Sequence, residues 1–309
     1  MKKELLFTLK SPCRDTFRIH GFRFGSGKKS VAIVGAMRGD EVQQQYVCAR
    51  VVNALLTLED RGAINPEHEI LVIPSANHFS MNISKRFWAM DNTDVNRMFP
   101  GFSQGETTQR IAAALFKQVQ GYSYGIQLAS FYMSGDCVPH IRMMRTGYED
   151  EPLGKSFGLP YTMTCQPRPY DTTLLNYNWQ IWKTKAYSLY CGQTASLDEQ
   201  SAQTAISAIL RFMDSQGIIK SPQSPAFLSQ HVPEEKLVHI KAHKAGILFL
   251  MSKPHDHVAR GQILGHILDP YDGSIRWEIQ SPIDGTIFHA ANKPLVLENG
   301  LLFRIIPDA

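Results

Sequence analysis

Long apolar runs are missing from this sequence. The longest uninterrupted one, residues 246–251, is far shorter than the roughly 20 residues that a membrane-spanning helix needs, so we expect no transmembrane segment and no membrane partner. Near the N-terminus, Met1-Lys2-Lys3 carries charge, but residues 5–9 are too few for the apolar core of a signal peptide and are typical of a strand. The cytoplasm is therefore the expected location.

Cysteine pairs and charge clusters are missing as well. The five cysteines are odd in number and scattered, with no Cys-x-x-Cys spacing, which indicates buried free thiols instead of a zinc knuckle or a redox pair. The formal net charge is only +4, and the longest basic runs are Lys2-Lys3 and Lys28-Lys29. Nucleic-acid binding is not expected, and any positive potential that matters is expected to be local to a pocket.

The chain has the length and apolar content of a globular protein of roughly two domains. Its 309 residues are 43% hydrophobic, which is enough for a sizeable core. In the first part, apolar runs typical of buried strands (31–35, 70–73, 124–131, 186–190) alternate with helical spacing over 40–56, 107–119 and 201–216. Together with two short edge strands before residue 30, this alternation predicts an α/β domain with a largely parallel core.

The composition changes at Ser221-Pro222-Gln223-Ser224-Pro225. Beyond this segment, short strand-like runs are separated by turn signals such as Pro282-Ile283-Asp284-Gly285 and Asn299-Gly300. We therefore predict an N-terminal domain over residues 1–220, a linker over 221–231 and a small all-β domain over 232–309.

Two segments about fifty residues apart carry most of the functional information. The first is Gly35-Ala36-Met37-Arg38-Gly39-Asp40-Glu41, and the second is Asp94-Val95-Asn96-Arg97-Met98-Phe99-Pro100-Gly101. With the tail turns Gly261-Gln262-Ile263-Leu264-Gly265 and Ser281-Pro282-Ile283-Asp284-Gly285, they make nearly the whole chain resemble the succinylglutamate desuccinylase and aspartoacylase family. This resemblance implies a zinc carboxypeptidase-like mixed sheet flanked by helices and a C-terminal lipoyl-like, barrel-sandwich β-domain. It also implies hydrolysis of an amide bond in an N-acyl amino acid or a peptide-like substrate.

The resemblance implies a zinc site that this sequence does not complete. Family members place a His and a Glu ligand in a His-Gly-Asp/Asn-Glu segment; here Glu41 matches the carboxylate, but Arg38 stands in place of the His. The third family ligand is a His in an Asp-x-His segment, and by register Ala129 takes its place. The catalytic Glu lies in a Leu-Glu-x-Gly strand end, where this chain has Tyr190.

These replacements affect the expected chemistry directly. A guanidinium cannot deprotonate to coordinate a cation, and one remaining carboxylate would not hold zinc tightly. Without the metal and the general base, nothing generates a hydroxide at neutral pH. We predict that ordinary zinc hydrolysis is impaired.

The part of the site that binds a carboxylate is retained. Asn96 and Arg97 match the family pair that holds the carboxylate of the substrate, and Arg86 matches an upstream substrate-binding arginine. A guanidinium can bind a carboxylate in a bidentate manner. We predict a cationic pocket formed by Arg38, Arg86 and Arg97 that binds an acidic small molecule or a peptide terminus. The alternative for Arg38 and Glu41 is an ordinary salt bridge at a helix start.

An active, divergent hydrolase is the alternative function. It would assemble a displaced metal site from Glu41 with His78 or His140, or work without a metal. The alternative for both histidines is that they are scattered loop residues. Tyr190 is the one candidate catalytic side chain; since its ordinary pKa is near 10, a packing or ligand-lining role is favoured over that of a base. An oligomer is possible.

Overall fold

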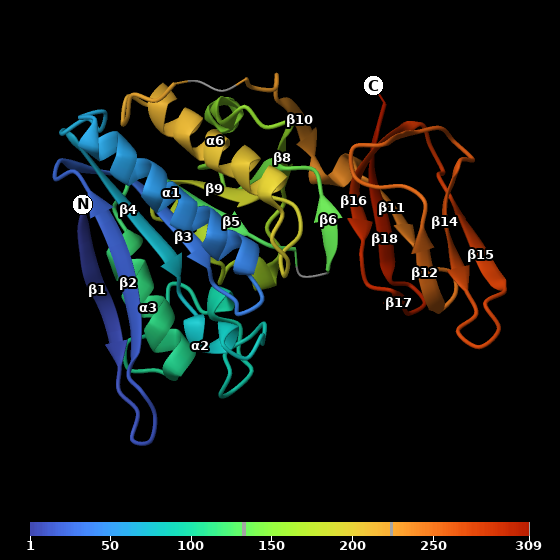
Figure 1. Cartoon of the computed structure of the whole chain (residues 1–309), viewed down its shortest axis with the longest axis horizontal. Helices are drawn as coiled ribbons and strands as arrows, with labels where there is room; N and C mark the ends of the chain where they lie inside the picture. The colour runs from blue at the N-terminus through green and yellow to red at the C-terminus, as the bar shows by residue number, and fades with distance from the viewer. Residues whose placement is uncertain (132–133, 223–224, 309) are drawn as a thin grey trace. The chain divides into compact units, whose positions relative to one another are not determined.

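The computed structural model describes residues 1–131, 134–222 and 225–308. By its internal contacts the chain divides into two compact units (Figure 1). The N-terminal unit comprises Met1–Ser130 and Pro139–His231, and the C-terminal unit comprises Phe131–Val138 and Val232–Ala309. Residues 223–224, within the predicted linker, lie outside the described residues.

A nine-stranded mixed sheet, as far as the chain is described, forms the centre of the N-terminal unit. Its order is β1-β2-β4-β3-β5-β9-β7-β8-β10, and β4, β3, β5 and β9 run parallel to one another. The strands are β1 (Lys2–Leu9), β2 (Phe17–Phe24), β3 (Lys28–Ala36), β4 (His68–Ser75), β5 (Tyr124–Ala129), β7 (His140–Met144), β8 (Tyr161–Cys165), β9 (Lys185–Tyr190) and β10 (Gln230–Pro233).

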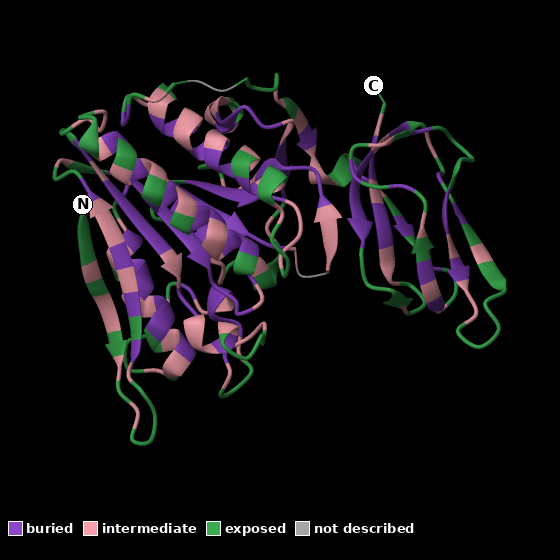
Figure 2. Ribbon diagram, viewed as in Figure 1, coloured by how far each residue is buried: buried purple, intermediate pink, exposed green. Residues whose placement is uncertain are grey.

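Helices cover both faces of this sheet, which explains the uninterrupted apolar run of β3. Side chains of a strand point alternately to its two faces. Val31 and Ile33 belong to the core cluster that includes α1 and α6, whereas Ala32 and Val34 belong to the cluster that includes α3 and α5. Figure 2 shows the central strands as the most buried part of the unit.

The helices of this unit differ widely in length. The long ones are α1 (Val42–Asp60), α3 (Thr107–Val119) and α6 (Glu199–Ser215), and the short ones are α2 (His78–Met81), α4 (Glu151–Gly154) and α5 (Leu175–Ile181). Single 3₁₀ turns are η1 (Val95–Arg97), η2 (Lys155–Phe157) and η3 (Pro169–Asp171). The Asp198 side chain caps α6 by accepting a hydrogen bond from the Gln200 N–H, which satisfies one of the free donors at the helix start.

The C-terminal unit consists of two antiparallel sheets around one apolar core. One sheet has the order β11-β18-β16-β13, with β6 paired to β16, and the other has the order β15-β14-β12-β17. The strands are β6 (Gly135–Cys137), β11 (Val238–Lys241), β12 (Gly246–Leu250), β13 (His257–Val258), β14 (Ile263–Leu268), β15 (Ile275–Gln280), β16 (Gly285–Ala291), β17 (Leu295–Val296) and β18 (Leu301–Pro307), with the 3₁₀ turn η4 (Glu234–Lys236) before β11. The predicted fold class, an α/β sheet domain with an additional small β-domain, is confirmed.

Candidate functional site

Four loop segments meet where the parallel strands β3, β4 and β5 end. They contain Arg38 and Glu41, Arg86, Asp94 to Arg97, and Ser130. Parallel strands end at the same edge of a sheet, so the residues that follow them come together. The loop after β3 carries Arg38 and Glu41, and it packs against the segment after α2 through a hydrogen bond from the Gly39 N–H to the Arg86 carbonyl, 3.0 Å. A Cβ on Gly39 would lie 2.2 Å from the Lys85 carbonyl oxygen, so only glycine fits this close approach.

Arg38 lies at the centre of this edge, between two carboxylates. Its Nη2 is 2.9 Å from Asp94 Oδ2, its Nε donates to both Asp94 oxygens at 3.1 and 3.2 Å, and its Nη1 donates to Glu41 Oε1 at 3.1 Å. Only 5% of Arg38 is exposed to solvent. Burial, the largest single influence, lowers the pKa of Arg38, but Glu41 and Asp94 outweigh it and raise the pKa above its ordinary value. The guanidinium is therefore a buried, paired cation.

Both carboxylate oxygens of Glu41 accept hydrogen bonds from this chain. Oε1 accepts from Arg38 Nη1 and, at 2.5 Å, from the Ser130 hydroxyl. Oε2 accepts from the backbone N–H groups of Met37 and Arg38 at 2.8 and 3.1 Å. Glu41, just before α1, thus holds the loop that follows β3 in place.

Arg86 lies beside this pair and is more accessible. Its Nη1 is 2.7 Å from Asp40 Oδ2, and its Nη2 is 3.4 Å from the Ser130 hydroxyl, which Arg38 Nη1 also approaches at 3.5 Å. The side chains of Arg86 and Asp40 are 20% and 25% exposed. Ser130 thus links the two arginines.

Arg97 is the most exposed of the three predicted arginines, with 32% of its side chain accessible. Its Nε is 3.8 Å from Asp94 Oδ2, its Nη1 donates to the Tyr170 carbonyl at 2.8 Å, and its guanidinium lies over the Tyr170 ring. The neighbouring Asn96 is buried, and its side-chain oxygen accepts from the Leu175 N–H at 3.4 Å. Asn96 therefore braces the start of α5.

Charge is balanced within this cluster of Arg38, Arg86, Arg97, Asp40, Glu41 and Asp94. Three guanidinium groups face three carboxylates, so the six side chains together carry no formal net charge. The ion pair between Arg38 and Glu41, which was the alternative to a ligand-binding role for Arg38, is present. Contact between Arg97 and Asp94 was the alternative to a ligand-binding role for Arg97, whereas the bonds of Arg38 to Asp94 and of Arg86 to Asp40, and the contacts with Ser130, were not predicted.

The other predicted residues lie outside the charge cluster's ion pairs: Ala129 is the strand neighbour of Tyr190, and His140 and His78 each stack on an aromatic ring. Ala129, at the end of β5, pairs laterally with Tyr190 at the end of β9, and Arg142 Nη1 lies 3.5 Å from the Tyr190 hydroxyl. The His140 ring stacks on Tyr190 with centroids 4.7 Å apart. The His78 ring stacks on Phe17, and burial lowers its pKa.

A group of three or more His, Cys, Asp or Glu side chains suited to a metal does not occur among residues 1–131, 134–222 and 225–308. The structure therefore does not bring His78 and His140 together with Glu41. No helix in the described ranges is long and apolar enough to cross a bilayer.

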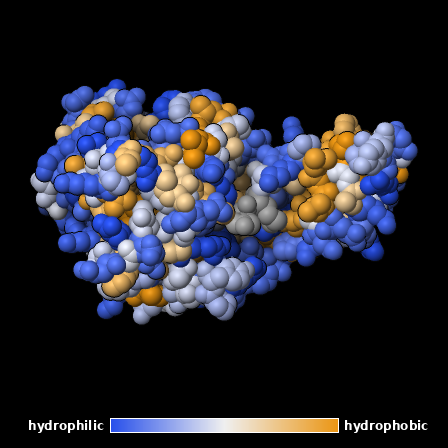
Figure 3. Space-filling view, turned by 90° about the horizontal axis from the view of Figure 1, so that it is seen from below, coloured by the Kyte–Doolittle hydropathy of each residue, from blue (hydrophilic) through white to orange (hydrophobic). Residues whose placement is uncertain are grey.

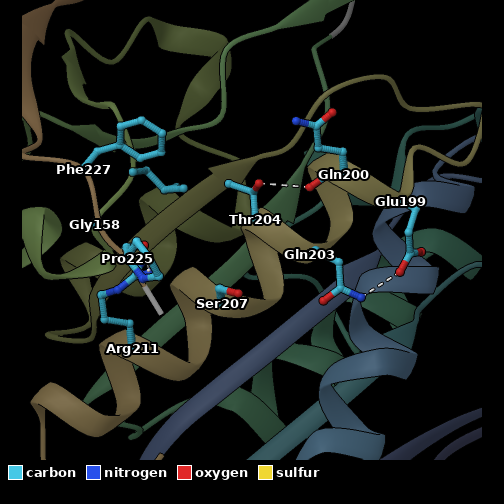
Figure 4. Close-up of a pocket in the computed structure, with 10 residues that line it drawn as sticks. Gly158, Glu199, Gln200, Gln203, Thr204, Ser207, Arg211, Pro225 and Phe227 are labelled. Carbon is cyan, nitrogen blue, oxygen red and sulfur yellow. Dashed lines mark hydrogen bonds between the residues drawn. The ribbon is translucent and has the colours of Figure 1, made fainter. Parts of the chain in front are cut away.

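A separate groove of about 540 Å³ runs along α6 (Figure 4). Gln200, Gln203, Thr204 and Ser207 line it from the helix, and Phe227 from the opposite wall. Two of the helix side chains are already engaged locally, because Thr204 donates to the Gln200 carbonyl and Gln203 to Glu199. None of the residues predicted for the functional site lines this groove.

Comparison with known families identifies the class of protein. Residues 27–215 match the model of the succinylglutamate desuccinylase/aspartoacylase catalytic domain, and the chain belongs to this family. A comparison with curated proteins gives no significant match.

Solved structures share the fold over nearly the whole chain. A succinylglutamate desuccinylase from Silicibacter sp. TM1040 superposes with a TM-score of 0.83 at 15% identity, covering 99% of this chain and 94% of that one. The product-bound ectoine utilization protein from Ruegeria pomeroyi gives 0.78 at 16% identity, with 95% and 90% covered. An aspartoacylase family protein from Mesorhizobium loti gives 0.75 at 20% identity, with 96% and 91% covered.

Proteins of this family are typically zinc-dependent, but the donors found here do not fit a zinc ion. Zinc needs three deprotonated protein ligands in its catalytic sites. Glu41 offers one carboxylate whose two oxygens already accept four hydrogen bonds, and the neighbouring Arg38 is held in its charged form. Ala129 has no ligand atom in its side chain.

Proposed function

We propose that this family member does not hold a catalytic zinc ion at the family position and that it binds an acidic small molecule or a peptide terminus through Arg97 and Arg86. One observation carries the first half: the Arg38 guanidinium lies 3.1 Å from the carboxylate that would otherwise bind the metal. A cation already compensates Glu41, so a second cation beside it would meet electrostatic repulsion.

The second half depends on how accessible the arginines are. Arg38 is nearly enclosed and pairs with two carboxylates, whereas the Arg97 side chain is 32% exposed and its nearest carboxylate oxygen is 3.8 Å away. An acidic group that reaches Arg97 would gain charge-assisted hydrogen bonds without first separating a buried ion pair. Arg86, whose side chain is 20% exposed, is the second contact that we assign to the ligand.

Metal content tests the first half. We expect protein purified without chelator or added metal to contain no stoichiometric zinc. The double variant Arg38→His/Ala129→His restores the two missing imidazoles beside Glu41 and is expected to acquire zinc, while Ala129→His alone is the matched control and is not. Near-stoichiometric zinc in the wild type that disappears in Glu41→Ala would contradict the proposal and support a divergent hydrolase.

Ligand-induced thermal stabilisation tests the second half. We expect one or more members of a panel of dicarboxylates and N-acyl amino acids to raise the melting temperature of the wild type and to have no effect on Arg97→Ala. Arg110→Ala removes an exposed arginine elsewhere and serves as the control. Stabilisation that survives in Arg97→Ala would rule out this assignment.

A further inference from the structure

The outer face of the four-stranded sheet in the C-terminal unit carries an apolar row across its full width. Residues directly opposite each other in neighbouring antiparallel strands place their side chains on the same face. In the order β15-β14-β12-β17, the strand registers therefore align one aliphatic side chain from every strand: Ile275, Leu268, Ile247 and Leu295. The alternate residues of the inner strands, such as Ile267 and Leu248, face the core of the unit.

This apolar row is open to solvent. Ile275 and Leu295 at its ends are 55% and 70% exposed, and Leu268 and Ile247 between them are partly exposed. Phe249, two residues after Ile247 and so on the same face, is 55% exposed. Figure 3 shows apolar side chains gathered on the surface of this unit. Since the open face of an antiparallel sheet is ordinarily polar, such a patch indicates an interaction surface.

A second row, beside the apolar one, carries opposite charges at its two ends. It begins with Glu278 on β15, His266 on β14 and Phe249 on β12. The Leu248 N–H donates to the Pro294 carbonyl, which continues the register of β12 with β17 and places Lys293 opposite Phe249. Glu278 and Lys293 are exposed, and neither forms an ion pair among the described residues. Three strand spacings, about 14 Å, separate their backbones, so they do not pair within one chain.

We propose that this face packs against the same face of a second copy of the chain, about a twofold axis that runs parallel to the strands between β14 and β12. Such an axis exchanges the two edges of the sheet, so β15 of one copy lies over β17 of the other, and each row lies over itself. Ile275 then meets Leu295 of the other copy, and Leu268 meets Ile247. Glu278 of each copy faces Lys293 of the other, which gives two symmetric ion pairs.

The charges select this axis over its alternative. A twofold axis perpendicular to the strands, through the apolar row, would place each strand over itself. Glu278 would then face the opposite end of β15 and Lys293 the opposite end of β17, and both charges would lose water without gaining a partner. The axis along the strands superposes the apolar rows and compensates both charges. It also fits the aligned packing of two sheets, in which strand directions differ by about 30° and the sheets lie about 10 Å apart.

Sedimentation equilibrium of the full chain tests this interface. We expect the wild type to sediment as a dimer. Leu295→Asp places a carboxylate in the apolar row without a partner and should give a monomer. Because Leu295 is exposed within one chain, this change leaves the core of the unit intact. Leu228→Asp makes the same substitution at a fully exposed leucine of the N-terminal unit and should remain dimeric.

Mixing two charge variants tests the axis itself. Glu278→Lys and Lys293→Glu each bring like charges together twice in the dimer, so each should self-associate about tenfold more weakly than the wild type. An equimolar mixture of the two should recover the wild-type association, because each carboxylate again faces an ammonium group. Lys241→Glu makes the same charge change on the other sheet of the unit and should associate like the wild type.

Three results would overturn the proposal. The first is a wild type that sediments as a monomer at every accessible concentration, which would leave the apolar face to a partner of another kind. The second is a dimer that Leu295→Asp leaves intact. The third is a pair of charge variants that associate no better when mixed than when alone.

Discussion

Each unit buries a titratable side chain, and its pKa is shifted in opposite directions in the two units. In the N-terminal unit, Arg38 is 5% exposed, charged and bonded to two carboxylates. In the C-terminal unit, His289 on β16 is 1% exposed, and neither ring nitrogen has a hydrogen-bond partner in the described part of the chain. Burial, followed by the charges of Arg304 and His239, lowers the pKa of His289 to about 3.

The opposite pKa shifts of Arg38 and His289 follow from the charges of the neighbouring side chains and not from the degree of burial. Desolvation disfavours the charged form of both groups. Two carboxylates reverse this effect at Arg38, whereas Arg304, opposite His289 in the sheet register, adds to it. The stability of the N-terminal unit therefore depends on an intact ion cluster. The stability of the C-terminal unit depends on a neutral His289 imidazole.

Removing Asp94 should have the largest effect. Asp94→Ala leaves the Arg38 guanidinium buried beside Glu41 alone, and breaking a buried pair in this way costs about 3–5 kcal/mol of unfolding free energy. Chemical denaturation followed by far-UV circular dichroism measures it. If Asp94→Ala loses less unfolding free energy than Asp40→Ala does, the stability contributed by the described cluster does not depend on Asp94.

Periodicity predicted most of the fold because burial determines it. The continuous apolar runs and the helical spacing predicted β3, β4, β5, β9 and all three long helices close to their observed bounds. Strands β7 and β8 carry polar or sulfur-containing residues between their apolar ones and were not predicted. Nor does the sequence signal that residues 131–138 belong to the C-terminal unit, since the pairing of β6 with β16 joins segments about 150 residues apart in the chain.

Part of the charge cluster could be predicted from the sequence, and the missing part has a physical reason. Motif positions identified Arg38, Glu41, Arg86 and Arg97 as residues of one site, and these side chains do lie together. The partners Asp94 and Ser130 lie 56 and 92 residues from Arg38. Which carboxylate compensates which guanidinium depends on how the loops fold back at the sheet edge, and spacing along the chain does not encode it. The sequence indicated the cations and a possible Arg38–Glu41 pair, but not the other carboxylates that neutralise them.

Acid should affect the C-terminal unit through His289. Its ordinary pKa is 6.5 and its folded pKa is about 3, so between these values the unfolded chain binds a proton that the folded chain does not. Stability is therefore complete above pH 6.5 and falls as the pH decreases, by about 2 kcal/mol at pH 5 from this group. Comparing the wild type with His289→Met across this range measures the contribution. The exposed His257→Gln is the control, and equal pH slopes for wild type and His289→Met would contradict the prediction.

The smallest effect is expected at the accessible side of the charge cluster. Asp40→Ala breaks the ion pair with Arg86, but both side chains already contact solvent, and water can replace the lost carboxylate. Ion pairs of this kind contribute at most about 1 kcal/mol. The same denaturation experiment should therefore place Asp40→Ala close to the wild type and far from Asp94→Ala, with a further decrease of the difference from the wild type at high salt. A loss comparable to that of Asp94→Ala would mean that Arg86 depends on its carboxylate as strongly as Arg38 does, and an arginine bound so firmly could not turn toward an acidic ligand.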